Sequence, residues 1–441
     1  MHEKINEFVN SIEEKVIGYR RDFHKYAESA WTEYRTASLI ARQLTDLGYE
    51  VKIGKEVMNV ADRMGVPSEA VLERHYQRAL KQGADVEFAE KMRGGFPAVV
   101  GILKNGEGPV IAMRFDFDAV DMKENKNPEH RPVREGFVSV NDEAMHSCGH
   151  DGHASIGLGV AETLIQVKDQ IKGTVKLIFQ HAEEGVRGAK SIATSGILDD
   201  VDYIYAGHLG SGSPKGAVVC SRDNFLATAK FDAFFTGAPA HAGGTPEGGH
   251  NAMLAAATAV LNLYAIPRHS GGSTRINVGR LNAGTGRNVI CPNAHLAVET
   301  RGETSALQEH MYNYAMKVLE NSAAMHGCSL EIVSMGGASS GKSDRDFAAI
   351  GKRVADTIED FNVVLEAPPS NAGGGSEDFS YMMERVQKHG GKATFFGIGA
   401  NLGGWGHHTA EFDLDESAFK GAVKLFSLLA LHLMDNWEAQ A

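Results

Sequence analysis

The spacing of hydrophobic residues changes along the chain from a helical period to short apolar runs. From Ile5 to Leu47 the apolar residues recur at helical spacing, which predicts two helices flanking a turn near His24 to Ser29. Further on, apolar runs alternate with helical segments. Strands are predicted at Ala98–Leu103, Val110–Phe115, Thr174–Phe179 and Tyr203–Ala206, and helices at Ala154–Gln166 and Gly188–Ser195. This alternation is typical of an α/β sheet covered by helices on both faces.

A different order of elements begins after residue 226. The predicted elements are strand Lys230–Phe235, helix His250–Leu263, strands Arg275–Leu281 and His295–Thr300, helix Ala306–His326 and strand Ser329–Val333. This order indicates a separate α+β unit with an antiparallel sheet. The α/β pattern then resumes through Ala393–Gly397. We therefore predict a mostly parallel-stranded α/β domain, formed by residues 1–225 and 340–441, that is interrupted by an inserted α+β domain at 226–339.

Two connecting segments also stand out. The charged stretch Glu69–Lys91, within residues 55–95, is predicted to be a helical insertion on the surface, and its role cannot be read from its composition. The Gly-rich stretch Gly336 to Gly341 is predicted to be the linker that returns the chain to the first domain.

Composition and charge exclude several classes of protein. The chain has 441 residues, longer than the roughly 250–300 that one core supports, so two domains are expected. A net charge of −12 argues against a nucleic-acid partner. The chain lacks both an apolar leader segment and a run of about 18 apolar residues, which predicts a cytoplasmic protein without a membrane partner. Its 4 scattered cysteines are expected to be reduced thiols.

Two short segments concentrate side chains that bind metals. Met145 to His153 contains three histidines, a cysteine and Asp151, more donors than a structural loop needs. Phe179 to Gly185 places Glu183 and Glu184 at the end of a predicted buried strand, where open α/β sheets bind ligands. Structural alternatives are a helix start capped by Asp151 and a pair of glutamates at a helix N-terminus.

Histidines elsewhere add to these clusters. His208 follows the apolar run at Tyr203–Ala206, and His407 and His408 follow a Gly-rich turn. A lone histidine at a strand end is usually a polar residue satisfied by local hydrogen bonds. Only the combination with the two acidic and thiol-bearing clusters favours metal chemistry. A structural zinc site is not indicated, because no second CxxC or HxxxH motif pairs with Cys148.

Eight short motifs follow one another in a recognisable order. They are Arg20 to His24, Arg114 to Ala119, His146 to His153, Gln180 to Gly185, Gly237 to Gly243, Asn288 to Ile290, Ser376 to Phe379 and His408 to Asp413. In these motifs the chain resembles, over nearly its whole length, the dinuclear metallohydrolases that include aminoacylases, hippurate hydrolases and auxin-conjugate hydrolases. One departure is Val120-Asp121, where the family commonly has Leu-Pro. This departure affects turn geometry more than ligand identity.

The resemblance implies a centre of two divalent metal ions, manganese, zinc or cobalt. The implied ligands are Cys148, His150, Glu184, His208 and His408. If the thiolate of Cys148 bridges the two ions, each ion has three protein ligands and keeps open positions for water and substrate. His150 and Glu184 would then complete one site, and His208 and His408 the other.

The resemblance also implies a reaction, the hydrolysis of an N-acyl amino acid at its amide bond. Glu183 stands where the family has its general base, and Asp118 and Asp151 are expected to orient ligand histidines through their second ring nitrogen. Aroyl or arylacetyl conjugates of Glu or Asp, such as p-aminobenzoyl-glutamate, are the expected substrates. Indole-acetyl-aspartate and N-acyl amino acids in general are the alternatives.

The inserted domain of this family acts as a lid and a dimerisation domain. His241 matches a residue that reaches the active site, typically across a dimer, where it stabilises the oxyanion; an exposed loop histidine is the alternative reading. Asn288 and Arg301 match positions that hold the substrate carboxylate, and Arg275 and Arg287 are further cationic candidates.

The resemblance leaves two other classes of function open. The expected partner is a second copy of the chain or a homologous subunit in a heteromer, and a homologous subunit can be inactive on its own. The intact ligands and Glu183 argue against a purely structural subunit. A ligand-binding module without turnover would bind product tightly and release no amino acid.

Overall fold

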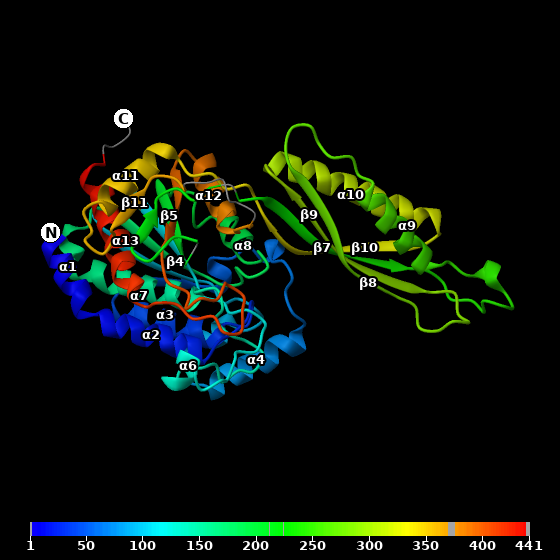
Figure 1. Ribbon diagram of the computed structural model, residues 1–441, viewed down its shortest axis with the longest axis horizontal. Helices are drawn as coiled ribbons and strands as arrows, with labels where there is room; N and C mark the ends of the chain where they lie inside the picture. Colours follow the sequence, from blue (N-terminus) through cyan, green and yellow to red (C-terminus); the bar gives the residue numbers. More distant parts are fainter. Residues whose placement is uncertain (1, 211, 224, 369–374, 438–441) are drawn as a thin grey trace.

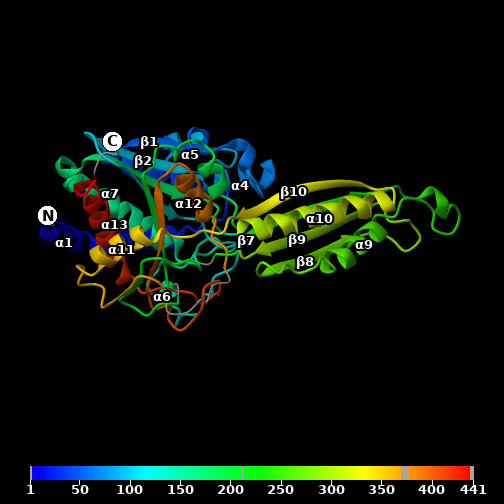
Figure 2. The same cartoon turned by 90° about the horizontal axis from the view of Figure 1, so that it is seen from above.

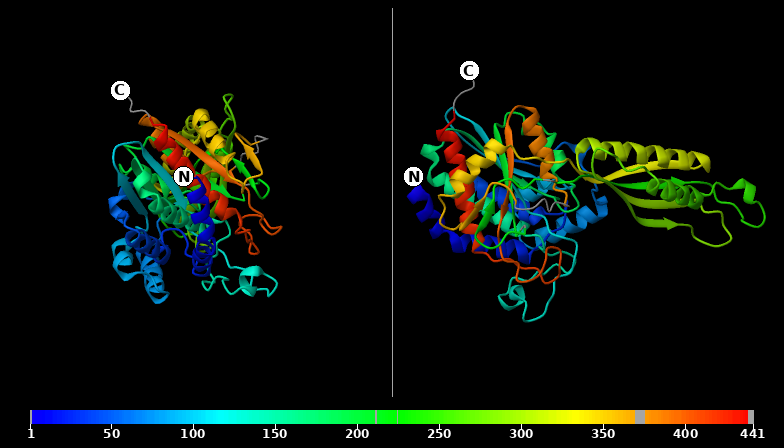
Figure 3. Two further views of the ribbon diagram at one scale, coloured as in Figure 1. Left: turned by 90° about the vertical axis from the view of Figure 1, so that its left-hand side faces the viewer. Right: turned by 45° about the horizontal axis from the view of Figure 1, so that its top comes forward.

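The protein has a large lobe and an elongated second lobe that extends away from it. The computed structural model describes residues 2–210, 212–223, 225–368 and 375–437 (Figure 1). The view from above and the right-hand view of Figure 3 show the same two lobes (Figures 2 and 3). Among the described residues, no helix has the length and apolar character needed to cross a membrane.

The large lobe is built on an eight-stranded mixed sheet. In spatial order its strands are β1 (Glu50–Ile53), β2 (Val99–Asn105), β4 (Gly173–Gln180), β3 (Val110–Asp116), β5 (Tyr203–Leu209), β12 (Lys392–Ile398), β6 (Ala217–Val219) and β11 (Val363–Leu365). The central strands β4, β3, β5 and β12 are parallel neighbours, and β11 also pairs with β6 in parallel. The pairs β1–β2, β2–β4 and β12–β6 are antiparallel. The predicted α/β fold is confirmed, and its parallel strands form the centre of the sheet.

Helices cover both faces of this sheet. One face carries α1 (His2–Ser11), α2 (Glu13–Lys25), α3 (Tyr34–Asp46), α7 (His150–Gln166), α11 (Arg345–Ala355) and α13 (Ala418–Asp435); the other carries α8 (Ala189–Ala193) and α12 (Phe379–Lys388). Successive strand residues alternate between the two cores, as where Ile111 and Met113 join the first and Ala112 the second. Both faces are therefore buried, which explains the continuous apolar runs.

The N-terminal segment contains three helices where two were predicted. The break falls at Ile12, whose backbone leaves the helical region (φ −103°, ψ 3°). Ile5, Val9, Ile12 and Val16 are all buried. Because they keep helical spacing across the break, the hydrophobic pattern does not reveal it.

The predicted surface insertion forms α4 (Glu69–Lys81) and α5 (Val86–Met92). Its preceding segment reaches the second lobe, because the backbone N–H of Gly65 donates to the carbonyl of Ser334 at 3.1 Å. The indole N–H of Trp31 donates to the carbonyl of Met64 at 3.0 Å and holds this segment on the large lobe. Further short elements are α6 (Arg131–Arg134) and the 3-10 helices η1 (Gly54–Glu56), η2 (Val60–Asp62), η3 (Lys168–Gln170) and η4 (Pro246–Gly248).

The second lobe is a four-stranded antiparallel sheet with two helices on one face. Its strands are β10 (Ser329–Ala338), β7 (Ala227–Thr236), β9 (Asn293–Gly302) and β8 (Thr274–Ala283), and its helices are α9 (Ala252–Tyr264) and α10 (Ser305–Met325). These elements share a separate hydrophobic core. One prediction is corrected here: Gly336 and Gly337 belong to β10 and not to a linker, because pairing with β7 continues to Ala338.

Candidate dinuclear metal centre

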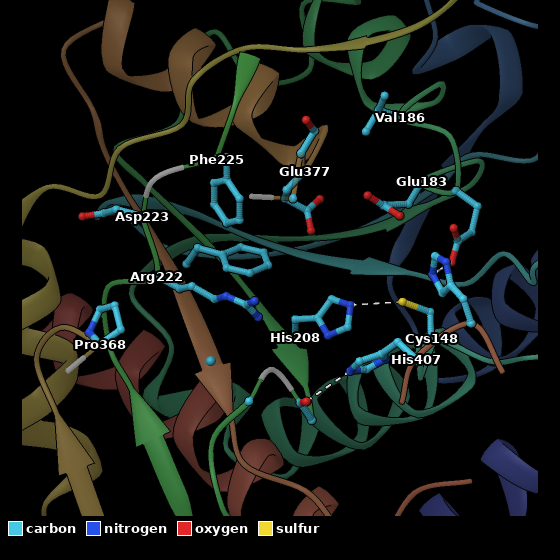
Figure 4. Close-up of a pocket in the computed structure, with 18 of the residues that line it drawn as sticks. Cys148, Glu183, Val186, His208, Arg222, Asp223, Phe225, Pro368, Glu377 and His407 are labelled. Atoms are coloured by element: carbon cyan, nitrogen blue, oxygen red, sulfur yellow. Dashed lines mark hydrogen bonds and ion pairs between the residues drawn. The ribbon is translucent and has the colours of Figure 1, made fainter. Parts of the chain in front are cut away.

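The candidate site lies where the parallel strands of the large sheet end. Asp118 follows β3, Glu183 and Glu184 follow β4, and His208 is the penultimate residue of β5. Since carboxyl ends of parallel strands meet at one edge, these side chains converge although they are distant in sequence. A cavity of about 650 Å³ opens there, and Figure 4 shows Cys148, His208 and Glu183 pointing into it.

The five predicted ligands come together in two groups that share Cys148. In one group the donor atoms of Cys148, His150 and His208 lie within 4.8 Å of one another, and in the other so do those of Cys148, Glu184 and His408. A thiolate common to both groups is the arrangement expected of a bridging ligand. His150 and Glu184 also have donor atoms within 4.8 Å of one another, in a further group with Glu183, so the predicted division between the two ions stays a prediction.

The ring orientation of each ligand is set by its surroundings. His150 Nδ1 donates to the carbonyl oxygen of Asp118 at 3.0 Å and to its carboxylate Oδ1 at 3.2 Å, so that Nε2 carries the lone pair. His208 Nδ1 donates to the carbonyl of Leu209 at 2.8 Å, and its Nε2 lies 3.4 Å from Cys148 Sγ. His408 Nε2 lies 3.2 Å from a carboxylate oxygen of Glu184.

The donor set fits divalent cations. His150 Nε2 is buried and makes no hydrogen bond of standard geometry with any residue that the structure describes. A buried polar atom without such a bond is unusual, and a cation bound to Nε2 would account for it. Burial raises the pKa of the Cys148 thiol. A cation bound beside it would supply the charge that stabilises the thiolate. Sulfur, nitrogen and oxygen donors together suit zinc, manganese or cobalt.

Asp118 and Asp151 differ in what they contact. The carboxylate of Asp118 accepts the backbone N–H groups of Glu183 at 3.0 Å and Glu184 at 2.9 Å, in addition to the ring of His150. Asp118 therefore positions His150, Glu183 and Glu184 together. Its contact with the ring of His150 is the one that was predicted. The prediction for Asp151 is wrong: it accepts from Arg20 Nε and from His24 Nδ1, both at 2.8 Å, in the buried base of the lobe.

Glu183 lies beside the two groups that share Cys148, and its carboxylate is within 4.8 Å of donor atoms of His150 and Glu184. Its carboxylate Oε2 is 4.0 Å from His150 Nε2, and its side chain is mostly buried. Burial raises the pKa of Glu183 well above its ordinary value, and the neighbouring carboxylates of Glu377, Asp378 and Glu184 raise it further. Two divalent cations nearby would oppose this shift. A carboxylate with a raised pKa at such a site can accept and return a proton.

Backbone strain accompanies these placements. Ala182, Val186 and His408 have positive φ angles of 51°, 60° and 60°, which residues with a Cβ rarely adopt. Ala182 and Val186 flank the two acids, and His408 is itself a predicted ligand. Local strain of this kind persists only where the surrounding structure holds the backbone in place. It orients side chains in directions that a relaxed turn would not allow.

The residues predicted to bind substrate are not all at the cavity. Arg301 lines it and forms an ion pair with Glu299 at 2.9 Å. His241 and Asn288 are exposed neighbours in the second lobe, where the N–H of Ala242 donates to the carbonyl of Asn288 at 3.0 Å. Among the described residues of this one chain, neither lines the cavity. The loops that carry them lie at the end of the lobe farthest from the large sheet (Figures 1 and 2).

A buried ion network behind the site was missed by sequence reasoning. The guanidinium of Arg114 contacts Asp116 at 2.6 Å, Glu377 at 3.0 Å and Asp378 at 3.3 Å, and all four side chains are buried. The signal was present, because Arg114 and Asp116 interrupt an otherwise apolar strand, and an unpaired charge in a buried strand is costly. Their partners could not be named, since Glu377 and Asp378 follow more than 250 residues later.

With this geometry established, comparison with known proteins identifies the family. Residues 112–432 match the sequence profile described as peptidase family M20/M25/M40. The chain belongs to this peptidase family. The resemblance inferred from the motifs is thereby confirmed, and with it the prediction that the chain is a metal-dependent amidohydrolase. The M20 profile covers both of the acidic and thiol-bearing segments and all five predicted ligands.

Individual relatives match over almost their full lengths. Identity is 46% to one of the subunits of p-aminobenzoyl-glutamate hydrolase from Escherichia coli, with 98% of each chain covered. It is also 46% to the indole-3-acetyl-aspartic acid hydrolase of Enterobacter agglomerans, with 97% of this chain and 98% of the relative covered. The crystal structure of an aminobenzoyl-glutamate utilization protein from Klebsiella pneumoniae superposes with a TM-score of 0.85 at 40% identity, covering 97% of this chain and 98% of that one.

Proposed function

We propose that this M20 family member hydrolyses the amide bond of aroyl or arylacetyl conjugates of glutamate or aspartate. p-Aminobenzoyl-glutamate is the first candidate substrate, and indole-3-acetyl-aspartate and other N-acyl amino acids are the alternatives. The observation that carries this proposal is the sharing of Cys148 between two donor groups, with Glu183 beside them in the lining of the cavity. The names of the two relatives at 46% identity support the choice of substrates.

Five side chains would hold two divalent ions, with zinc, manganese and cobalt as the candidates. They are Cys148, His150, Glu184, His208 and His408. When bound, such ions polarise an amide carbonyl and lower the pKa of water, which makes hydrolysis feasible at neutral pH. The chain contributes the rigid placement of the donors, because Asp118 and Leu209 fix the rings of His150 and His208.

Glu183 would move the protons of the reaction. Its carboxylate accepts a proton from the attacking water and delivers it to the amine that leaves, so that a poor leaving group departs as a neutral amine. Burial and the neighbouring acids raise the pKa of Glu183, which favours transient protonation. Asp118 acts as a positioning residue, because its carboxylate holds the backbone N–H of Glu183 at 3.0 Å.

The second lobe would act as lid and dimerisation domain, with residues 226–339 inserted between 1–225 and 340–441. His241 would then serve the site of another subunit by stabilising the oxyanion, with Asn288 and Arg301 binding the carboxylate of the substrate. Support comes from the exposed position of His241 and Asn288, remote from the cavity of their own chain. The partner would be a second copy or a homologous chain, since the Escherichia coli relative is one component of a larger hydrolase by its name.

The adjacent pair Glu183 and Glu184 offers a matched test. We expect Glu183→Ala to keep both metals and to lose at least the 10²–10⁴-fold typical of general acid–base groups in kcat, and Glu184→Ala to lose metal as well. Metal content by mass spectrometry and release of p-aminobenzoate measure both. Glu183→Ala losing metal, or retaining its turnover, would contradict the assignment.

The wild-type chain decides between the classes of function. Release of amino acid by the purified, metal-loaded chain supports an autonomous enzyme. Activity that appears only when a homologous partner chain is added supports the heteromer. Tight binding of glutamate and p-aminobenzoate without any release, alone or with that partner chain, would overturn the proposed hydrolysis in favour of a binding module.

A further inference from the structure

Arg222 is a cation of the cavity to which no role has been assigned. It follows β6 in the segment that leads to the second lobe, and Figure 4 shows its side chain pointing into the cavity toward His208. Its backbone is fixed, because its N–H donates to the carbonyl of Phe395 at 2.7 Å. The next residue, Asp223, is anchored by Arg345 Nη2 at 2.8 Å and by the N–H of Ser343 at 2.7 Å. The guanidinium is thus held at the cavity by a rigid segment.

The guanidinium of Arg222 has no anionic partner within the described part of the chain. It forms neither an ion pair nor a side-chain hydrogen bond with any described residue, whereas Arg301 in the same cavity is paired with Glu299. The carboxylate of Glu377 also lines the cavity, but its Oε1 already accepts from Arg114 at 3.0 Å and from the N–H of Phe379 at 3.1 Å. The apolar rings of Phe225 and Phe395 complete this wall.

An unpaired charge in such a place is costly. Burial lowers the pKa of the Arg222 guanidinium, and Glu377 and Cys148 oppose this effect only in part. Removing water from a cation that has no hydrogen-bonded anion is among the larger free-energy costs in a folded protein. A bound anion removes this penalty, and the planar fork of arginine fits a carboxylate at two points.

We propose that Arg222 binds the side-chain carboxylate of the acidic amino acid and so determines the preference for Glu and Asp. This inference rests on the proposed function. The α-carboxylate is common to every N-acyl amino acid and is bonded to the carbon next to the scissile nitrogen, so it stays close to Glu183. Lys230 also lines the cavity, where its acidic neighbours are Glu299 and Glu183 and its cationic neighbours are Arg301 and Arg187. The groups that act on Arg222 are instead Glu377 and Cys148. On this assignment the α-carboxylate lies toward Lys230 and Glu183, and the side-chain carboxylate lies toward Arg222.

The test compares two substrates that differ in one charge, p-aminobenzoyl-glutamate and p-aminobenzoyl-glutamine. For Arg222→Met we expect kcat/KM to fall about 100-fold with the glutamate conjugate, mainly through KM, and to change little with the glutamine conjugate. Arg222→Lys keeps the charge without the fork and should recover part of the loss. Arg353→Met, at an exposed position on α11, is the matched control and should behave as wild type.

The other outcomes are equally informative. Equal losses with both conjugates would overturn the inference, because Arg222 would then hold the α-carboxylate or support the fold. A fall in the metal content of Arg222→Met would overturn it too, because the positive charge of Arg222 would then serve to stabilise the metal centre and not to bind substrate. Selective loss of the glutamate conjugate in Lys230→Met, with none in Arg222→Met, would move the subsite to Lys230.

A binding measurement separates this inference from the proposed function. If the wild-type chain hydrolyses no N-acyl amino acid, the proposed function fails. Calorimetry of metal-loaded protein with free glutamate and free glutamine then still decides the role of Arg222. A preference for glutamate that disappears in Arg222→Met supports the subsite, and equal binding of the two amino acids by wild type refutes it.

Discussion

Asp118 is the residue whose replacement tests the geometry of the site most directly. Its carboxylate accepts three hydrogen bonds, from His150 Nδ1 at 3.2 Å, from the N–H of Glu183 at 3.0 Å and from the N–H of Glu184 at 2.9 Å. Burial raises its pKa, but the hydrogen bond and charge of His150 and the N–H of Glu184 hold the pKa of Asp118 below its ordinary value. The side chain is therefore a carboxylate at neutral pH, with each contact directed to its negative charge.

Asp118→Asn keeps the shape and removes the charge. The amide nitrogen cannot accept, so in either orientation at least one of the three donors loses its partner. A hydrogen bond to a charged group contributes roughly 1.5–3 kcal/mol, and the remaining bonds become neutral and weaker. Residues that orient metal ligands typically change metal affinity 10–100-fold, about 1.4–2.8 kcal/mol, which agrees with one such bond. We expect a weakening of metal binding in this range.

Chelator competition measures the metal affinity, and thermal unfolding without metal measures the stability of the fold. Asp151→Asn is the matched control, because Asp151 is equally buried and also accepts from a histidine, His24, but contacts no predicted ligand. It should lower the unfolding temperature with little effect on metal affinity. The reasoning is refuted if Asp118→Asn binds both metals as wild type does, or if Asp151→Asn weakens binding equally.

Two further predictions concern titration and assembly. Burial lowers the pKa of His24, but Glu124 and Asp151 together raise it to about 9. The protonated ring therefore stabilises the fold fully below pH 6.5, and this stabilisation is lost as pH rises through 9. The unfolding temperature should fall between these two pH values. NMR detection of the His24 ring titrating below pH 7 would contradict this. Mixing His241→Ala chains with Glu183→Ala chains should restore part of the activity; a mixture that exchanges chains but stays inactive would place the site within one chain.

Much of the fold could be predicted because its elements carry strong periodic patterns. β4 was located from its apolar run, and β7 to β10 with α9 and α10 were located in the correct order. The strands β1, β6 and β11 were not predicted. They are only 4, 3 and 3 residues long, too short for alternation to be recognised. Sheet order was also beyond prediction, since β4 enters between β2 and β3 by pairing that no local pattern encodes.

In the candidate site, too, the sequence indicated which residues take part but not which of them come into contact. The proposed ligands were named from motifs, and the structure brings all five to one edge of the sheet. Their division into two groups depended on which loops meet in space. The resemblance implied that Asp151 orients a ligand histidine, but its carboxylate contacts Arg20 and His24 instead. Neighbours on a helix point about 100° apart, so the side chains of His150 and Asp151 in α7 serve different environments.

The way the second lobe is attached has a mechanical consequence. The chain enters it through β7 and leaves it through β10, and these strands are paired side by side up to Thr228 and Ala338, next to the large sheet. The lobe is therefore joined to the body through a single two-stranded ribbon, and a small bend in that ribbon swings the far end through a much longer arc. The hydrogen bond between Gly65 and Ser334 reaches this ribbon from the segment that precedes the surface insertion. This contact ties the ribbon to the large lobe at Ser334, so a bend of the ribbon at that point has to break it.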